Sequence, residues 1–362
     1  MITKLHIAGY KSIKDQTVDL SPINILIGSN GVGKSNFISI FSLIRAIYQQ
    51  ELQSYVLQKG GANNLLYFGK KTTPSIQISL DFEGLEASSI NKFEVNLGVT
   101  KDDLYIHSVD TQFYNGITWY PQNHEQNVRE SHFRYSKSRQ AYYVNPQLQT
   151  FEVYHFHDTG DSSPIKSPCL LSDNNYLKKD GSNIAAFLWQ LKENHFKNYI
   201  RIVKTIQSIA PFFQDFILNP FGNQDSPFIK LAWSEKGVMD SYFDAYSLSD
   251  GTLRFICLVT LLLQPNPPAT IIIDEPELGL HPVAINKLAG LIHKISDKTQ
   301  FIISTQSTDF VDNFEPQNIL VADRVEKATI FKHLDINQLK DWLNEYSISA
   351  IWRKNMIGGQ PF

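Results

Sequence analysis

The stretch Gly28-Ser29-Asn30-Gly31-Val32-Gly33-Lys34-Ser35 matches the pattern G-x-x-x-x-G-K-[ST], which in proteins forms a loop around phosphate groups. Its glycines let successive backbone N–H groups turn toward phosphate oxygens. A helix that starts at Lys34 would add the positive end of its dipole. Lys34 would contact the β- and γ-phosphates, and the Ser35 hydroxyl would bind Mg²⁺. The stretch therefore predicts a site for a nucleoside triphosphate with Mg²⁺.

The flanking sequence has the pattern that such a loop needs. Residues 23–28, INILIG, read as a buried strand, and residues 35–58 place apolar side chains at helical spacing. Residues 4–10 and 75–84 alternate apolar and polar side chains, as antiparallel strands do. Strand, glycine loop and helix together predict the start of an α/β unit.

The middle of the chain has a different pattern, and the α/β pattern returns after it. Residues 105–120 and 141–160 are aromatic, β-branched and interrupted by Gly, Pro and Asn, which predicts short strands, and residues 180–216 have helical spacing. From residue 245, a helix, the strand 269–274, a helix and the strand 300–305 follow. We expect one α/β nucleotide-binding domain, formed by residues 1–95 and 241–362 and split by a β-rich, then helical insertion at 96–240.

The strand ATIIID ends in Asp274, and Glu275 follows it. A carboxylate at the carboxyl end of a strand beside a phosphate loop can hold Mg²⁺, usually through water, and Asp274 takes that role. Glu275 would then orient and deprotonate the attacking water as the general base. On its own the pair could also be a strand end followed by a polar turn. The phosphate loop in the same chain favours the catalytic interpretation.

Composition excludes several classes of protein. The 362 residues are 42% hydrophobic and 19% charged with a formal net charge of −3, which fits a globular protein and argues against a basic surface all over. The two cysteines, Cys169 and Cys257, lie far apart and have no metal-ligand spacing, so we expect a reducing cytoplasm. The N-terminus is too polar for a signal peptide, and no apolar run is long enough to cross a bilayer.

Leu248-Ser249-Asp250-Gly251-Thr252 precedes an apolar run with helical spacing. Ser249 and Asp250 are good helix-capping residues, so on its own this stretch predicts a helix start. Its position between the phosphate loop and the acidic strand gives a second interpretation. Ser249 offers a hydroxyl, Gly251 permits close approach, and a helix N-terminus favours an anionic phosphate.

Together these stretches resemble ATP-binding cassette ATPases of the RecF/SMC/OLD kind, including the stand-alone "AAA family" predicted ATPases of bacteria. The resemblance covers roughly residues 1–85 and 180–362 and is poor between them. The family's loop, G-x-N-G-x-G-K-S-N, is matched from Gly28 to Asn36, which implies nucleotide contacts from Asn30, Gly31, Val32, Gly33, Lys34, Ser35 and Asn36. Its acidic strand, hhhDEPExGLHP, is matched from Ile271 to Pro282. Residues 180–193 and 355–361 look like the predicted-ATPase branch.

The resemblance implies an α/β P-loop NTPase of the ABC/RecF-like head type, a mixed sheet flanked by helices. Residues 248–252 then correspond to the signature motif L-S-G-G-Q, which in the family touches the γ-phosphate bound by the opposite protomer. Ser249 and Gly251 would make that contact. The motif departs at Asp250 and Thr252, and a carboxylate near the γ-phosphate is repelled unless it points away or caps the helix.

Other family positions are matched less closely. Gln58 would reach Mg²⁺ and the attacking water, although a solvated helix end explains it almost as well. Gln306 stands where relatives carry a switch histidine; it can hydrogen-bond the γ-phosphate but carries no proton charge, so slow or partner-dependent hydrolysis is expected. The D-loop would be Gly279-Leu280-His281. Lys11 would reach phosphate, unless it is an ordinary surface lysine.

The resemblance favours a Mg²⁺-dependent ATPase that closes as a head-to-tail homodimer around ATP and gates or drives a partner in DNA repair or anti-phage (antiviral) defence. The partner would be DNA or a separate nuclease or effector, because the chain after Ser304 leaves no room for a Toprim nuclease domain. An ATP-binding scaffold with little hydrolysis is the alternative that Gln306 suggests. A transporter subunit fits the long insertion poorly. His155 and His157 alternate on an expected strand, which favours an exposed face over a metal site.

Overall fold

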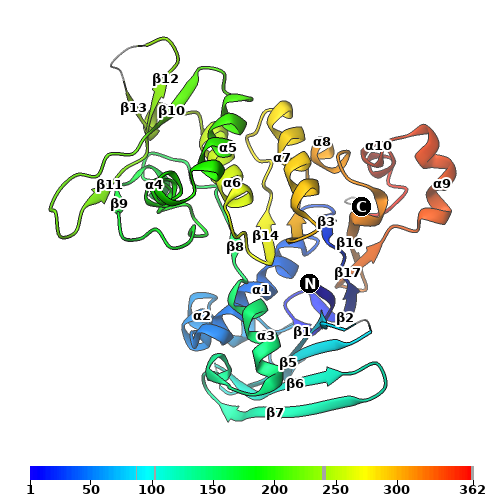
Figure 1. The fold of residues 1–362 in the computed structure, drawn as a ribbon. Helices are drawn as coiled ribbons and strands as arrows, with labels where there is room; N and C mark the ends of the chain where they lie inside the picture. The colour runs from blue at the N-terminus through cyan, green and yellow to red at the C-terminus, as the bar shows by residue number, and fades with distance from the viewer. Residues whose placement is uncertain (87, 102, 239–241, 360–362) are drawn as a thin grey trace. The chain divides into compact units, whose positions relative to one another are not determined.

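A computed structural model of the chain describes residues 1–86, 88–101, 103–238 and 242–359. It divides into two compact units (Figure 1). Unit 1 contains Met1–Val153, Pro268–Ile272 and the chain from Ser296 onward; unit 2 contains Tyr154–Pro267 and Ile273–Ile295. In the described part of the chain, none of the helices combines the length and apolar character that a membrane crossing needs.

Unit 1 holds two six-stranded sheets. Its elements are β1 (Ile2–Tyr10), β2 (Ile13–Asp19), β3 (Ile23–Ile27), α1 (Lys34–Gln49), α2 (Leu52–Gln58), β4 (Ser75–Glu83), β5 (Ile90–Val99), β6 (Leu104–Tyr114), β7 (Trp119–Val128), α3 (Arg139–Gln149), β15 (Gln300–Ser304), α8 (Thr308–Val311), β16 (Ile319–Val325), β17 (Ala328–His333), α9 (Ile336–Glu345) and α10 (Ile348–Arg353). Strands β8 (Val153–Tyr154) and β14 (Thr270–Asp274) each end in unit 2.

One sheet has the order β17-β16-β3-β15-β14-β8. Strand β3 pairs in parallel with both β15 and β16, and all five of its residues are buried. A parallel strand covered on both faces has to be apolar throughout, which is why INILI lacks alternation. The pairing therefore fixes the position of the carboxyl end of β3 in the sheet, and the phosphate loop follows that end directly.

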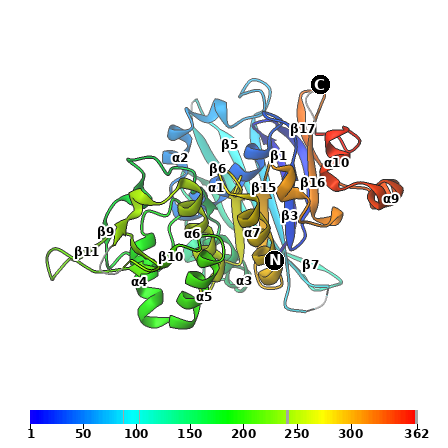
Figure 2. The same cartoon turned by 90° about the horizontal axis from the view of Figure 1, so that it is seen from above.

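The second sheet is antiparallel, with the order β2-β1-β4-β5-β6-β7; Figure 2 labels its strands β1, β5, β6 and β7. Helix α3 packs against β5 and β6. The prediction of strands over residues 141–149 was wrong: they belong to this helix. Ser138 caps it by accepting a hydrogen bond from the Ala141 backbone N–H at 3.1 Å, and Ala141, Val144 and Leu148 bury one face at helical spacing.

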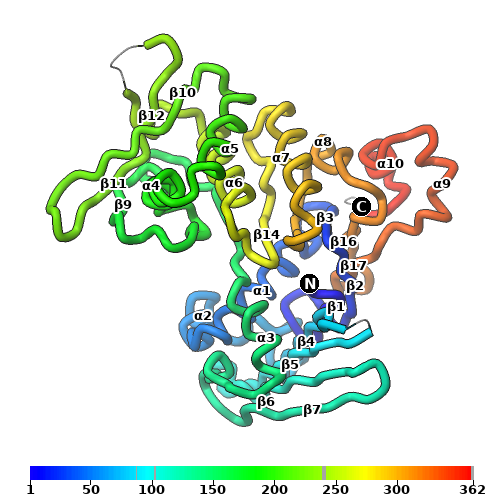
Figure 3. The backbone as a smooth tube through the Cα atoms, in the orientation of Figure 1, coloured from blue at the N-terminus to red at the C-terminus, as the bar shows by residue number. Residues whose placement is uncertain are grey.

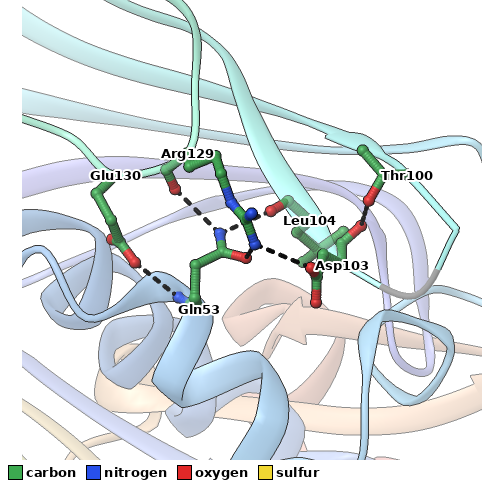
Figure 4. A network of polar contacts seen from close by, with 6 residues as sticks. All are labelled: Gln53, Thr100, Asp103, Leu104, Arg129 and Glu130. Carbon is green, nitrogen blue, oxygen red and sulfur yellow. Dashed lines mark hydrogen bonds and ion pairs between the residues drawn. The ribbon is translucent and has the colours of Figure 1, made fainter.

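The single helix that the spacing predicted over residues 35–58 is two helices. Gln50 has φ 64° and ends α1, and α2 begins two residues later. Glu130 caps α2 from a distance, because its carboxylate accepts from the backbone N–H groups of Leu52 and Gln53 at 2.9 Å each. Figure 4 shows the contact with Gln53. The Gln53 amide donates to the Leu104 and Arg129 carbonyls. The long helix breaks because these distant partners stabilise a second helix start.

Unit 2 combines helices with short strands and loops (Figure 3). It contains β9 (Cys169–Leu170), α4 (Ile184–Asn194), α5 (Phe196–Gln207), β10 (Phe213–Ile217), β11 (Phe228–Ile229), β12 (Ala232–Glu235), β13 (Phe243–Asp244), α6 (Asp250–Leu263) and α7 (Pro282–Ile295). Helix α6 is apolar on nearly all sides and packs on α5 and α7. Its Cys257 is completely buried, and burial raises the pKa of the thiol well above its usual range.

Gln300, at the start of β15, ties the two sheets of unit 1 together. Its side chain is completely buried; its Oε1 accepts from the Ile2 N–H at 2.9 Å, and its Nε2 donates to the Ile2 and Ser21 carbonyls at 2.7 and 2.9 Å. All three partners are backbone groups near the first two strands. The Gln300 side chain thus makes the kind of hydrogen bonds that backbone groups make within a sheet, at a place where the two sheets meet.

Gln300→Leu should lower the free energy of unfolding by about 3 kcal/mol or more, because several buried backbone groups lose their partners. Urea denaturation followed by circular dichroism measures the change. Gln338→Leu, at an exposed position on α9, is the matched control and should change stability by less than about 0.5 kcal/mol. Equal stability of the two variants would contradict this role for Gln300.

Candidate nucleotide-binding site

The loop after β3 has the backbone that its glycines were expected to allow. Gly31 and Gly33 have φ of 74° and 119°, and α1 begins at Lys34. A Cβ on Gly33 would lie 2.4 Å from Thr329 Oγ1 and one on Gly28 would lie 2.6 Å from the Ala322 carbonyl oxygen, so unit 1 itself excludes side chains there. A Cβ on Gly31 would meet no described atom within 4 Å, so only its backbone conformation calls for glycine.

Lys34 lies inside the loop. Its side chain is 6% exposed, and its ammonium donates to the carbonyls of Gly28 at 2.6 Å and Ser29 at 3.1 Å. Ser35 is exposed on the first turn of α1, next to Asn36. The loop thus gathers a cation, a hydroxyl and a helix N-terminus at one place, which is the chemistry that binds a polyphosphate.

Two hydroxyl residues that the sequence patterns did not single out hold the loop in place. Thr329 on β17 donates to the Val32 carbonyl at 2.6 Å, and its Oγ1 lies 2.7 Å from Ser12 Oγ. Asn36 donates to the same Ser12 oxygen at 2.7 Å. No local sequence signal marks Thr329, because it comes 297 residues after Val32 and 317 residues after Ser12.

A basic hollow of about 420 Å³ lies beside the loop. It is lined by Lys11, Ser12, Asn36, Asn64, Leu66, Phe68, Arg324 and Lys327. Lys11 thus lines the same hollow as the loop residue Asn36, and it donates to Ser39 Oγ at 2.9 Å. Burial, and then the charge of Lys59, lower the pKa of Lys11 to about 8. Three cationic side chains in one hollow favour an anionic ligand.

A second hollow, of about 340 Å³, lies along the first residues of the loop. It is lined by Gly28, Ser29, Asn30, Gln306, Thr308, Trp352 and Gly359. Unit 1 therefore brings Gln306 together with Asn30. Gln58 is exposed at the end of α2 and lies among the lining residues of neither hollow. Gln360 and Pro361, which also entered the family resemblance, lie outside the described residues.

Unit 2 carries the acidic turn. Asp274 ends β14, and Glu275 has φ 47°, a left-handed conformation that is uncommon for residues other than glycine and recurs at active sites. The turn is closed by the N–H of Leu278 on the Glu275 carbonyl. His157 Nε2 lies 2.8 Å from the Asp274 carbonyl oxygen, so this histidine is part of the acidic turn's surroundings. Its alternation with His155 had suggested an exposed face instead.

The stretch at 248–252 is a helix cap with an additional contact. Ser249 caps α6 by accepting from the Thr252 N–H at 3.2 Å, and Asp250 is the first residue of the helix, where a carboxylate suits the dipole. A Cβ on Gly251 would lie 2.3 Å from the Gly279 carbonyl oxygen. Gly251 is therefore required by the contact between the helix start and the turn at residues 279–281.

Arg254, one turn into α6, joins three segments of unit 2. Its guanidinium donates to the Leu278 carbonyl at 2.7 Å, the His157 carbonyl at 2.8 Å and Thr159 Oγ1 at 3.3 Å. The five N–H donors of an arginine can reach three acceptors that lie in different directions, whereas the ammonium group of a lysine cannot. One side chain therefore joins the helix start to the acidic turn and to the segment that holds His157. Sequence spacing gave no sign of this link.

The residues present fit Mg²⁺ held together with a nucleotide. No group of three or more His, Cys, Asp or Glu side chains in the described ranges is placed to hold a metal ion by itself. Mg²⁺ keeps several waters and takes one or two protein oxygens besides those of phosphate, so a hydroxyl such as Ser35 and a carboxylate such as Asp274 suffice.

Comparison with known proteins agrees with this fold. A family model described as "AAA domain, putative AbiEii toxin, Type IV TA system" matches residues 23–312. A crystal structure of an Smc head bound to the C-terminal winged-helix domain of ScpA matches 94% of this chain and 99% of its own, with 14% identity and a TM-score of 0.60. A Pyrococcus furiosus Smc head with an extended coiled coil, bound to the C-terminal domain of ScpA, matches 95% and 98%, with 13% identity and a TM-score of 0.52.

These matches confirm the predicted fold class and family resemblance, an α/β P-loop ATPase of the ABC/SMC-like head type. The family model spans the phosphate loop, the stretch at 248–252 and the acidic turn. The two structures are too distant in sequence to carry over more than the fold.

Arg254→Lys should make the acidic turn less stable, because one ammonium cannot replace three guanidinium contacts. We expect the amide hydrogens of Leu278 and Leu280 to exchange about tenfold faster, measured by hydrogen–deuterium exchange. Arg201→Lys, the same change at an exposed position of α5, should leave both amides unchanged. Unaltered exchange in Arg254→Lys would show that the guanidinium does not support the turn.

Proposed function

The chain belongs to the AAA domain family whose model matches it from residue 23 to 312, and on this basis we propose that it is a Mg²⁺-dependent ATPase that closes head to tail with a second copy around ATP. The observation that carries the proposal is the loop of residues 28–35. Its lysine ammonium lies inside the backbone turn, and further cationic and hydroxyl side chains lie beside it.

Each residue of the loop has a defined task in this proposal. The backbone N–H groups from Asn30 to Asn36 and the first turn of α1 bind the phosphates, and Lys34 moves from its two carbonyl partners onto the β- and γ-phosphates. Ser35 and Asp274 hold Mg²⁺, which neutralises charge on the phosphates when it is bound. Glu275, whose backbone is in the left-handed region, takes the proton of the attacking water.

The basic hollow suits the rest of the nucleotide. Lys11, Arg324 and Lys327 supply positive charge for the phosphates, and the exposed ring of Phe68 offers an apolar surface for the base. Gln306 lines the second hollow together with Asn30, and in this proposal it donates to a γ-phosphate oxygen. Because an amide holds no transferable proton, we expect slow turnover, and a scaffold that binds ATP with little hydrolysis is the second candidate.

His157 lies next to the acidic turn. Its Nε2 is 2.8 Å from the main-chain carbonyl oxygen of Asp274. We propose that His157 positions the carboxylate of Asp274 and so acts indirectly on the metal. Gln58, which is exposed at the end of α2, keeps its proposed role as a ligand of Mg²⁺.

The second protomer completes the site in this proposal. Ser249 and Gly251 lie at an accessible helix start, and the first turn of α6 is favourable to a phosphate on another molecule. Arg254 and Gly251 link that helix start to the turn at 278–281, so closure on one face is passed on to the acidic residues. Asp250, as the first residue of α6, supports the dipole rather than facing the phosphate.

The opening and closing would act on a partner in the cytoplasm. The matched family is described in terms of a toxin of type IV toxin–antitoxin systems, which supports a role in anti-phage defence. The similar Smc heads were solved bound to the C-terminal domain of ScpA, which supports a protein partner. We propose a separate nuclease or other effector subunit as the target, with DNA as the substrate of that assembly.

Glu275→Gln should lower steady-state ATP hydrolysis by about 100-fold or more, because the water loses its general base, while ATP binding is kept. Phosphate release measures hydrolysis, and equilibrium dialysis measures ATP binding. Light scattering of the Glu275→Gln protein with ATP should show a dimer. Glu345→Gln, on the exposed face of α9, is the control and should keep wild-type turnover. Full turnover in Glu275→Gln would contradict the assignment; tight binding without turnover in the wild type would favour the scaffold.

ATP affinity should fall as pH rises from 7 to 9.5. The pKa of Lys11 is about 8 in the free protein, and a neighbouring phosphate raises it, so binding takes up a proton in this range. Between the free and the bound pKa, the affinity then falls by up to about tenfold for each increase of one in pH. Titration calorimetry measures the affinity. Lys11→Arg, which stays charged, should bind with little dependence on pH over the same range. Equal slopes for both proteins would exclude Lys11 from the phosphate site.

A further inference from the structure

The end of the described chain returns to the phosphate loop. After α10 the backbone turns at Asn355, which has φ 55°, and then passes through two glycines, Gly358 and Gly359, with φ of 78° and 71°. Gly359 is buried, and a Cβ there would lie 3.1 Å from the Cα of Gly28. A side chain does not fit well in that space, so glycine at 359 allows a direct contact between the chain end and the loop.

Gly28 is held by other parts of unit 1 as well. A Cβ on Gly28 would lie 2.6 Å from the Ala322 carbonyl oxygen of β16, and the Gly28 carbonyl accepts from the Lys34 ammonium at 2.6 Å. These contacts do not involve Gly359. The chain end is therefore tied to a part of the loop whose position β16 and Lys34 already determine.

A second contact ties the same C-terminal segment to α8. The carboxylate of Asp312, directly after α8, accepts from the Ser349 N–H at 2.8 Å and from the Ser349 hydroxyl at 2.6 Å. Helix α10 lies next to α8, and its residues Ile348 and Ile351 are buried (Figure 1). Hydrogen bonds to an ionised group are stronger than neutral ones, and a carboxylate suits the N-terminus of a helix. Asp312 thus fixes α10 on α8.

Gln306 lies between β3 and α8. The preceding residue, Thr305, donates its N–H to the Leu26 carbonyl of β3 at 3.0 Å, and its Oγ1 accepts from the Ser307 N–H at 2.9 Å. Ser307 caps α8 by accepting from the Phe310 N–H at 3.2 Å. The position of Gln306 therefore depends on that of α8, which begins two residues later.

The phosphate loop, the segment of Gln306 and the C-terminal segment line one hollow, the second hollow of about 340 Å³ described above. Asn30 belongs to the first of these segments, Thr308 to the second, and Trp352 and Gly359 to the third. Trp352 is only 5% exposed, so the C-terminal segment is packed into unit 1 rather than lying loosely on it. The contacts at Gly28 and at Asp312 therefore connect two walls of the hollow through the third.

We propose that residues 349–359 are a positioning segment for ATP: they hold Gln306 in the place, relative to the phosphate loop, from which its amide donates to the γ-phosphate. The inference rests on the proposed function, in which Lys34 contacts the β- and γ-phosphates. A diphosphate needs only the loop, whereas the γ-phosphate needs the loop and Gln306 together. Groups that are positioned before binding lose less entropy when the ligand arrives. The C-terminal segment therefore raises the affinity for ATP more than the affinity for ADP.

Gly359→Val tests the contact with Gly28. A branched side chain fits neither the space nor the left-handed backbone, so the chain end should leave the loop, while β3 and β16 keep the loop itself in place. ATP affinity, measured by titration calorimetry, should fall about tenfold or more, because a hydrogen bond to a charged phosphate oxygen is lost. ADP affinity should stay within about twofold. Gly237→Val is the matched control and should change neither affinity, because Gly237 has φ 81° and a Cβ there would meet no described atom within 4 Å.

A double substitution tests whether the effect depends on Gln306. In Gln306→Ala protein the amide is absent, so adding Gly359→Val should cause no further loss of ATP affinity. If Gly359→Val fails to fold, Asp312→Asn weakens the other contact instead. It should lower ATP affinity about threefold or more and leave ADP affinity unchanged.

The remaining outcomes are equally decisive. Equal losses for ATP and ADP, no loss for ATP, or a further loss in the Gln306→Ala protein would overturn the proposal. A wild-type protein that binds neither nucleotide would overturn the proposed function, and this inference with it. A wild-type protein that binds both nucleotides, with the same affinities as Gly359→Val, would overturn this inference alone.

Discussion

The parallel pairing of β3 with β15 and β16 is the constraint on which the proposed chemistry depends. It buries five consecutive residues and fixes where the chain must leave the sheet at Gly28. From there only glycine fits against Ala322 and Thr329, so the loop has one available course and α1 must start at Lys34. The apolar packing of a buried strand thus fixes the position of a row of backbone N–H groups that can bind phosphate.

In unit 2, too, close packing fixes the positions of the candidate site residues. The start of α6 approaches the turn after β14 so closely that Gly251 admits no side chain, and Arg254 ties that turn to the segment of His157. Helix cap and acidic turn are therefore closely packed and joined by hydrogen bonds. In the proposed cycle this packing matters more than the identity of each side chain, because a contact made by Ser249 on another molecule then alters the surroundings of Glu275.

Residues that are close in sequence were predictable and distant partners were not. The phosphate loop, the acidic strand and the cap at Ser249 each combine several constrained residues within a dozen positions, so their patterns are specific. Ser12, Thr329, Arg254 and His157 take part only because the fold brings separated segments together. The prediction of strands at 141–149 was wrong for a related reason. The aromatic neighbours of Ala141, Val144 and Leu148 obscured their helical spacing, and the cap at Ser138 favours a helix there.

The central claim, an ATP site shared between two copies, is tested most directly by mixing two inactive variants. Lys34→Ala lacks phosphate binding and Ser249→Arg lacks the surface for its partner, so each alone should hydrolyse no ATP. In a head-to-tail dimer, one protomer of each kind restores one complete site, and an equal mixture should recover about a quarter of wild-type turnover. Recovery of that order supports the shared site. A mixture as inactive as its components, or a Ser249→Arg protein with full activity, would contradict it.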